Sequence, residues 1–227
     1  MATIPTTYDE MFEELRGAVP LQFLRALGWM ESRLNPNTKT GSRWGLFQSG
    51  PENLADYNAA KKTNFTREYL LDPRINAQVF LWELARIMRT LASGGLAVDW
   101  GDDEYVKLIT MAWNAGWSAK RGVRRVLDFI KPKGLPFTHD VVRLQAANAG
   151  AASTLSSEKR AAWQKGVAAL YRQLERAPRD PIGASALDKL LALAKQARRS
   201  ATPAPDWLWL ALLVAAVVVT HRETKGG

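Results

Sequence analysis

The stretch Glu31-Ser32-Arg33-Leu34-Asn35-Pro36 closes an apolar run in which hydrophobic residues recur every three or four positions from residue 21. That spacing predicts an amphipathic helix. The residue before a proline is disfavoured in the helical region of backbone space, so Asn35-Pro36 is expected to end the helix. Residues 35–50, rich in Asn, Thr, Ser and Gly, are expected to form a loop. A helix, a glutamate and a polar loop in this order place Glu31 at the edge of a cleft.

The segments on either side of this stretch also predict helices. The helix that carries Glu31 is expected to span residues 8–34, with a break near residues 17–20. Further helices are predicted over residues 51–60, 73–92, 102–115, 118–130 and 137–149. The helix over 73–92 has proline in its first turn, Asp72 is expected to cap it, and Asn76 is expected to form buried hydrogen bonds. Few segments alternate with a period of two, so the fold class is mainly α, with room for a small hairpin near residues 38–47.

The composition restricts the chemistry. The 227 residues are enough for one sizeable domain plus extensions, with a formal net charge of +9 and a pI of about 9.9. A basic surface suits a polyanionic partner, such as cell wall, anionic lipid or nucleic acid. The lack of cysteine excludes disulfides, thiolate catalysis and cysteine zinc sites. The two histidines, His139 and His221, are far apart in sequence, so we expect no metal site and no cofactor.

Three more motifs follow Glu31-Ser32 in order. They are Gly45-Leu46-Phe47-Gln48, Met111-Ala112-Trp113-Asn114-Ala115-Gly116 and Leu135-Pro136-Phe137-Thr138. In this order the motifs resemble those of the lytic transglycosylases of bacteria and phages, which have a lysozyme-like fold and cut the glycan strands of peptidoglycan. The resemblance covers roughly residues 15–147, and it implies a lysozyme-like catalytic domain.

The resemblance implies that Glu31 is the sole acid/base catalyst. Cleaving a glycosidic bond requires protonation of the leaving oxygen, and a carboxylic acid can supply that proton near neutral pH only if apolar surroundings raise its pKa. Gly28-Trp29-Met30 can provide such surroundings. In the family, the 6-hydroxyl of the muramic acid attacks, the substrate's N-acetyl group assists, and a 1,6-anhydro sugar results. Without the neighbouring motifs, the favoured interpretation of Glu31 would be an ordinary surface glutamate on a helix.

The same resemblance implies a substrate-binding set of Ser32, Ser42, Gln48, Trp113 and Asn114. Gln48 would offer a donor and an acceptor to sugar groups, and the plainer alternative is a loop glutamine bound to the backbone. Gly45 would permit close backbone approach at the cleft. Trp113 can stack on a sugar and donate through its indole nitrogen, or it can simply pack in the core. Asn114 is expected either to orient Glu31 or to bind the N-acetyl group.

The chain departs from the family pattern at two positions. Trp113 replaces the tyrosine of the family's Ala-Tyr-Asn-Ala-Gly motif, and an indole cannot accept a hydrogen bond as a hydroxyl can. In the last motif the expected glutamate is absent, and His139 and Asp140 are the nearest residues that can substitute for it. The first change puts the rate or specificity in question, but not the fold.

The character of the sequence changes past residue 150. Residues 1–150 are assigned to the lysozyme-like domain and 151–200 to a C-terminal helical extension, with an amphipathic helix over 157–177. Residues 201–206 form a Pro-rich linker, 207–220 a candidate membrane helix, and 221–227 a polar tail.

The hydrophobic tail helix is short for a membrane span. Its 14 or so residues at about 1.5 Å each extend roughly 21 Å, against roughly 30 Å of bilayer hydrocarbon. The linker separates the run from the globular part, however, and Trp207 and Trp209 suit a membrane interface. A membrane-inserted helix is therefore favoured over an interfacial or oligomer-forming helix, and over docking onto the domain.

These observations predict a peptidoglycan lytic transglycosylase that cleaves the MurNAc–GlcNAc β-1,4 bond and serves a phage in local cell-wall penetration. Residues 1–14 lack the features of a secretory signal, so the expected location is a virion or a membrane anchor, with action on periplasmic peptidoglycan. Expected partners are glycan strands, a lipid bilayer through 207–220, and virion proteins. No specific nucleic acid is expected, because no nucleic-acid-binding signature accompanies the charge.

Two alternatives remain open at the level of the sequence. The first is a hydrolysing lysozyme on the same fold, in which Glu52 or Asp56 would activate water. The second is a non-catalytic protein that binds glycan or scaffolds a virion membrane.

Overall fold

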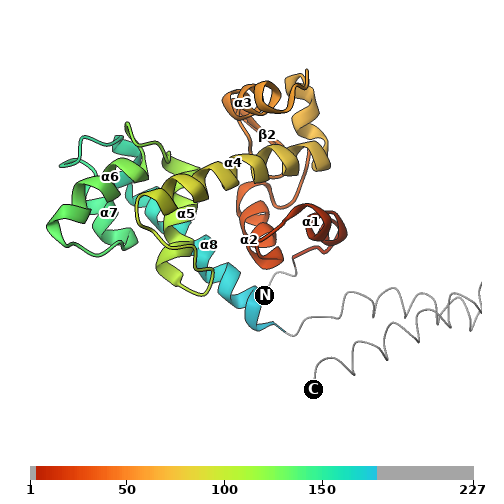
Figure 1. The fold of residues 1–227 in the computed structure, drawn as a ribbon. Helices are drawn as coiled ribbons and strands as arrows, with labels where there is room; N and C mark the ends of the chain where they lie inside the picture. The colour runs from red at the N-terminus through yellow and green to blue at the C-terminus, as the bar shows by residue number, and fades with distance from the viewer. Residues whose placement is uncertain (1–3, 178–227) are drawn as a thin grey trace, which may run out of the picture. The chain divides into compact units, whose positions relative to one another are not determined.

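The computed structural model describes residues 4–177, which fold into eight α-helices, three short 3₁₀ helices and one hairpin (Figure 1). The elements are α1 (Asp9–Leu15), α2 (Leu21–Ser32), β1 (Lys39–Thr40), β2 (Arg43–Trp44), α3 (Pro51–Lys61), η1 (Arg67–Leu71), α4 (Pro73–Ser93), α5 (Asp103–Ala115), α6 (Val123–Ile130), η2 (Lys131–Lys133), α7 (His139–Gln145), η3 (Ser153–Ser156) and α8 (Glu158–Arg176). The prediction of a mainly α fold with a small hairpin is confirmed.

The α2 helix carries Glu31 in its last turn. It ends at Ser32, two residues before the predicted end, because Arg33 and Leu34 adopt left-handed backbone with φ of 60° and 57°. The Leu34 amide donates to the Gly28 carbonyl at 3.2 Å. A Cβ at position 28 would lie 2.7 Å from Cδ2 of Leu34, so a glycine there lets the Leu34 side chain fold back over the helix. This reversal leaves Glu31 at the end of α2.

The hairpin and the loop that follows it are tied to α4 through Asn76. β1 and β2 pair antiparallel. The fully buried Asn76 side chain accepts from the Phe47 amide at 2.9 Å, and its Nδ2 donates to the carbonyls of Trp44 at 2.9 Å and Leu70 at 3.0 Å. Asn76, which was predicted to form buried hydrogen bonds, therefore satisfies three backbone groups around the 45–48 motif.

The α4 helix runs through the middle of the domain, between the hairpin side and the α6–α7 side (Figure 1). Asp72 caps it as predicted, its Oδ1 accepting from the Ile75 amide at 2.9 Å. The buried face of α4 contributes Phe80, Leu84, Ile87 and Leu91 to the main core. Phe80 meets the α5 residue Trp113 edge-on, with ring centroids 4.9 Å apart. This contact joins two of the helices that form the site.

The α6 helix is shorter than predicted and begins at Val123 rather than near residue 118. Residues 116–122 instead form a tight loop, in which the Gly122 amide donates to Ser118 O at 2.8 Å and the Val123 amide to Gly116 O at 3.0 Å. A Cβ at position 122 would lie 2.3 Å from the Ser118 nitrogen, so the loop closes on itself only with glycine there.

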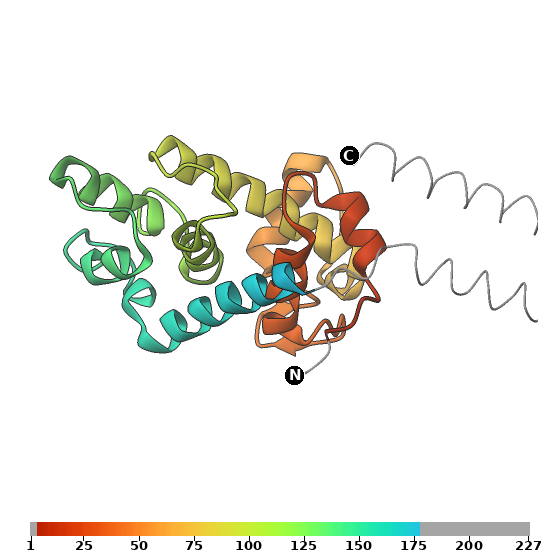
Figure 2. The same ribbon diagram turned by 90° about the horizontal axis from the view of Figure 1, so that it is seen from below.

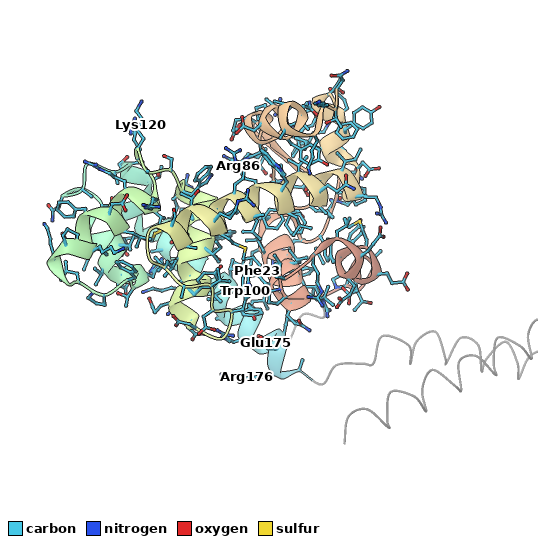
Figure 3. The ribbon with its side chains drawn as sticks, viewed as in Figure 1. Phe23, Arg86, Trp100, Lys120, Glu175 and Arg176 are labelled. Carbon is cyan, nitrogen blue, oxygen red and sulfur yellow. The ribbon has the colours of Figure 1, made fainter. Side chains whose placement is uncertain are left out.

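The α8 helix packs against α2 and α5 and is part of the same core (Figure 2). Val167, Ala168 and Tyr171 are buried in that core, and the Tyr171 ring meets Phe23 of α2 at 6.1 Å. Phe23 also packs against Trp100 at 4.8 Å, and the two residues lie beside each other near α8 in Figure 3. Chain contacts define one compact unit over Met1–Arg176. The boundary predicted near residue 150 is therefore too early, because residues 151–176 complete this core.

The rest of the predicted extension, the linker 201–206, the candidate membrane helix 207–220 and the tail 221–227 lie outside the described residues. Within residues 4–177, every helix is too short or too polar to cross a bilayer.

Candidate active site

Glu31 and Trp113, which are 82 positions apart in the chain, meet through one hydrogen bond. The Trp113 indole Nε1 donates to Glu31 Oε1 at 2.9 Å. The Trp113 side chain is only 8% exposed, and its ring packs against Phe80. An indole with its nitrogen engaged and its ring covered has little surface left to stack on a sugar. The structure thus engages Trp113 with Glu31 and with the core, and sugar stacking stays a prediction.

The surroundings of Glu31 favour its protonated form. Burial raises the pKa of the Glu31 carboxyl to about 7 from the ordinary value of 4.5. The Trp113 hydrogen bond and the charges of Arg43 and Arg160 lower the pKa, but burial outweighs them. Glu31 forms no ion pair within residues 4–177, and no carboxylate there contributes to its shift. Such a carboxyl can donate a proton at neutral pH.

Apolar and small side chains of α2 and α8 surround the end of α2. Met30 packs against the core, and its Cε would lie 3.3 Å from a Cβ at Gly166 of α8. Trp29 also packs against the core, and the Arg33 guanidinium lies over its ring at 5.0 Å. The apolar setting predicted from Gly28-Trp29-Met30 is thus present, and α8 adds to it.

Ser32 connects α2 to the loop of the 45–48 motif. It is 7% exposed, and its Oγ lies 2.8 Å from the Leu46 carbonyl oxygen and 3.1 Å from that of Gly28, so the two carbonyls share its single O–H donor. A hydroxyl engaged in this way holds the loop against the helix end rather than facing a ligand. The geometry gives Ser32 a role in positioning, which differs from the predicted role in substrate binding.

Gln48 is also directed inward. Its side chain is buried, and its Nε2 donates to the backbone carbonyls of Gly45 at 2.8 Å and Thr38 at 3.1 Å. These contacts match the plainer alternative, a loop glutamine bound to the backbone, and contact with sugar groups stays a prediction. Gly45 has φ +84°, and a Cβ there would lie 2.0 Å from the Leu70 carbonyl oxygen. Its close approach is thus to the protein's own backbone.

Ser42 lies in the turn between β1 and β2 and is exposed. The neighbouring Arg43 donates to Glu52 Oε1 at 3.0 Å and reaches Gln48 O at 3.5 Å. Because Arg43 also acts electrostatically on Glu31, the hairpin borders the site. Contact between Ser42 and substrate stays a prediction.

Asn114 is partly exposed and is bound by a residue that the sequence reasoning missed. Arg160 of α8 donates from Nη1 to the Asn114 backbone carbonyl and to Asn114 Oδ1, the latter at 3.1 Å. No motif marked Arg160, because it follows residue 150 and lies on a helix assigned to an extension. Its contact with Asn114 arises only in the folded structure, where α8 packs against α5.

The candidate second carboxylates are already paired. Glu52 binds Arg43, and Asp56 accepts from Arg86 at 2.7 Å. The residues nearest to the missing glutamate of the last motif are engaged elsewhere as well. His139 is buried, with its Nε2 2.7 Å from Gln164 Oε1 of α8, and Asp140 pairs with Lys165 at 3.0 Å. These contacts join α7 to α8.

A second indole–carboxylate pair joins α4 to the loop that follows α5. The Trp117 Nε1 donates to Glu83 Oε1 at 2.8 Å, and Arg86 binds Glu83 Oε2 at 3.0 Å. Beside this pair, Arg86, Arg89, Thr90, Ser93 and Trp117 line an open polar pocket of about 450 Å³. Arg86 is labelled above α4 in Figure 3. None of the predicted catalytic or substrate-binding residues lines this pocket.

Residues 4–177 contain no group of three or more His, Asp or Glu side chains arranged to hold a metal ion. The arrangement around Glu31 consists of one carboxyl, one indole, one amide and two arginines. It can supply and take back a proton and can bind polar groups of a neutral ligand.

Comparison with known proteins identifies this arrangement's family. Residues 11–126, more than half of the chain, match the family described as the transglycosylase SLT domain. Among solved structures, the fold is similar to the 70 kDa soluble lytic transglycosylase of Escherichia coli, with a TM-score of 0.53 and 16% identity. The match covers 76% of this chain and 25% of that protein, and it confirms the predicted lysozyme-like fold class. No curated protein sequence matches the chain. The chain belongs to the transglycosylase SLT domain family.

Proposed function

We propose that this protein is a peptidoglycan lytic transglycosylase that cleaves the MurNAc–GlcNAc β-1,4 bond and leaves a 1,6-anhydro-MurNAc end. The observation that carries the proposal is Glu31, a carboxyl with its pKa raised to about 7 by burial and held by the Trp113 indole. Membership of the transglycosylase SLT domain family supports the same activity.

In the proposed reaction Glu31 acts twice. As the acid, its protonated carboxyl gives a proton to the glycosidic oxygen while the bond to the anomeric carbon breaks. As the base, the resulting carboxylate takes the proton of the 6-hydroxyl as that oxygen bonds to the same anomeric carbon. The proton balance closes, because Glu31 ends protonated and no water is consumed. The Trp113 N–H can stabilise the carboxylate between the two steps.

A hydrolysing lysozyme is the alternative on the same fold, and it requires a second carboxylate to activate water or attack the sugar. Glu52 and Asp56 are held by Arg43 and Arg86. The charged groups that act on Glu31 are Arg43 and Arg160, not carboxylates. These contacts favour the route with a single glutamate.

The test is mass spectrometry of purified peptidoglycan digested with the full chain, with Glu31→Gln and with Glu52→Gln. We expect anhydro-muropeptides from the wild type and from Glu52→Gln, and none from Glu31→Gln. Reducing-end products would support the hydrolase instead. No products from any of the three proteins would support the non-catalytic glycan-binding or scaffold alternative, provided that circular dichroism shows all three folded.

We also propose that the enzyme acts on periplasmic peptidoglycan from a virion or a membrane, in local wall penetration by a phage. The support is the apolar run 207–220 with Trp207 and Trp209 at its start, together with the basic net charge. Flotation of the full chain with phospholipid vesicles tests membrane attachment, with Leu213→Asp as the comparison. Flotation of the wild type alone is the expected result, and equal flotation of both proteins would refute attachment through this run.

A further inference from the structure

The C-terminal end of α5 is completed by residues that follow the family-matched region. The last carbonyls of a helix have no partner within the helix. The Asn114 carbonyl accepts from Arg160, and the Ala115 carbonyl accepts from Thr154 Oγ1 at 3.1 Å. A cation at this helix end also interacts favourably with the helix dipole. Residues 154–160 thus hold the end of α5, where Trp113 and Asn114 lie.

The contact with Arg160 determines how the Asn114 amide is turned. A guanidinium can only donate hydrogen bonds, so the amide atom facing it at 3.1 Å must be the oxygen. The Asn114 NH2 group is then on the other side of the amide. Asn114 is partly exposed, and its NH2 has no hydrogen-bond partner within residues 4–177. The side chain therefore offers a ligand two N–H donors and no free acceptor.

This orientation distinguishes between the two roles expected for Asn114. Trp113 supplies the side-chain hydrogen bond to Glu31, and Asn114 supplies none. An amide that presents only donors recognises an acceptor oxygen. In a glycan of N-acetylated sugars, the amide carbonyl of the N-acetyl group is the strongest neutral acceptor.

We propose that Arg160 is a positioning residue of the active site, whose guanidinium holds Asn114 with its NH2 turned toward the N-acetyl carbonyl of the bound glycan. This inference rests on the proposed function, because it takes the glycan as the ligand. Arg160 also lies close enough to Glu31 to lower its pKa. One side chain from α8 therefore affects both the residue that binds the N-acetyl group and the residue that moves the proton.

The first experiment measures binding by calorimetry in the full chain carrying Glu31→Gln, so that the ligand is not turned over. The ligands are a β-1,4-linked N-acetylglucosamine oligosaccharide and the same oligosaccharide without its acetyl groups. Adding Arg160→Met, which keeps an unbranched side chain but removes all donors, is expected to weaken binding of the acetylated ligand roughly 3- to 10-fold, the value of one neutral hydrogen bond. The deacetylated ligand carries ammonium groups, so losing the Arg160 charge should leave its binding unchanged or make it tighter, and should not weaken it.

Two control variants separate positioning from folding. Thr154→Val removes the other contact to the end of α5 without touching the Asn114 side chain, so it should leave the affinity ratio of the two ligands unchanged. Asn114→Ala should reproduce the selective loss, and combining it with Arg160→Met should add nothing further. Equal weakening of both ligands by Arg160→Met, or full additivity with Asn114→Ala, would overturn the proposal.

The second experiment uses turnover of peptidoglycan and reads the pH profile. Removing the Arg160 charge raises the pKa of Glu31, so Arg160→Met should move the alkaline fall in rate to higher pH, and Arg160→Lys should restore it. An unmoved profile in Arg160→Met would contradict the electrostatic part of the proposal. If the wild type shows no turnover at all, the proposed function fails, whereas the binding experiment still reports on Arg160.

Discussion

Replacing Trp113 by phenylalanine removes one donor from Glu31 and preserves most of the packing. The indole Nε1 lies 2.9 Å from Glu31 Oε1, and its ring meets Phe80 edge-on. Phenylalanine retains an aromatic ring at this position but has no N–H. The hydrogen bond stabilises the ionised carboxylate, so its loss raises the pKa of Glu31 above the wild-type value of about 7.

The size of this shift follows from the strength of the bond. A hydrogen bond to a charged group contributes roughly 1.5–3 kcal/mol, and one pKa unit corresponds to about 1.4 kcal/mol. Glu31 is partly exposed, so solvent screens the interaction and we expect a rise of about one unit. An acid catalyst loses activity as the pH rises through its pKa. The alkaline fall in rate should therefore move from about pH 7 to about pH 8 in Trp113→Phe.

The assay is the initial rate of anhydro-muropeptide release across the pH range, with Trp117→Phe as the matched control. Trp117 donates the same type of bond, at 2.8 Å, but to Glu83 instead of Glu31. Its substitution should lower stability without moving the pH profile. The reasoning is refuted if the Trp113→Phe profile stays in place or moves to lower pH, or if both variants shift it equally.

Three further predictions concern stability. The folded-state pKa of Glu31 is raised, so between pH 4.5 and 7 the unfolded chain releases a proton that the folded chain keeps, and wild-type stability falls as the pH rises through that window. Thermal melts should therefore show Glu31→Gln more stable than the wild type above pH 7, by at most about 3 kcal/mol and less after solvent screening, with no such gain below pH 4.5. Gly45→Ala should cost about 3 kcal/mol in urea titrations, because its Cβ would lie 2.0 Å from Leu70 O, whereas Gly41→Ala, with φ +59° and open space around it, should cost about 1 kcal/mol. A chain ending at residue 150 should lack a cooperative melt by circular dichroism, whereas one ending at residue 176 should melt cooperatively. The reason is that Val167, Ala168 and Tyr171 complete the core. Equal cooperativity of the two chains would contradict this.

Local patterns were enough to predict most of the helices, because their determinants are themselves local. Asp72-Pro73 marks the start of α4 through a cap and a proline whose missing donor costs nothing there, and both features are present. The end of α2 was predicted less well. Asn35-Pro36 is a local stop signal, but the chain turns earlier because Leu34 folds back over Gly28, and that packing depends on contacts made across the turn.

The site residues show the same difference between local motifs and packing across the fold. Glu31 was predicted from a motif, and in the structure it is partly buried and bound by Trp113, with its pKa raised. Ser32 and Gln48 lie in the same motifs, yet their side chains bind the backbone of the 38–46 loop. A motif records which residues a site requires, and it does not separate those that face the ligand from those that hold the site together. Arg160 could not be found in this way, because only the packing of α8 brings it to Asn114.

Within residues 4–177 two glutamates accept hydrogen bonds from indoles, one at the end of α5 and one in the loop after it, and their difference supports Glu31 as the proton donor. Trp113 and Trp117 are four residues apart, and each donates to a carboxylate below 3 Å. Glu83 has a counter-charge in Arg86 at 3.0 Å, so both of its oxygens are engaged by donors. Glu31 has one donor and no ion pair within residues 4–177, and its arginines act only from beyond ion-pair distance. A carboxyl in apolar surroundings without a direct counter-charge keeps its proton to higher pH, as the raised pKa of Glu31 indicates. If Glu31 is the acid because it lacks a direct counter-charge, then introducing a counter-charge beside it should abolish activity even though the carboxyl remains.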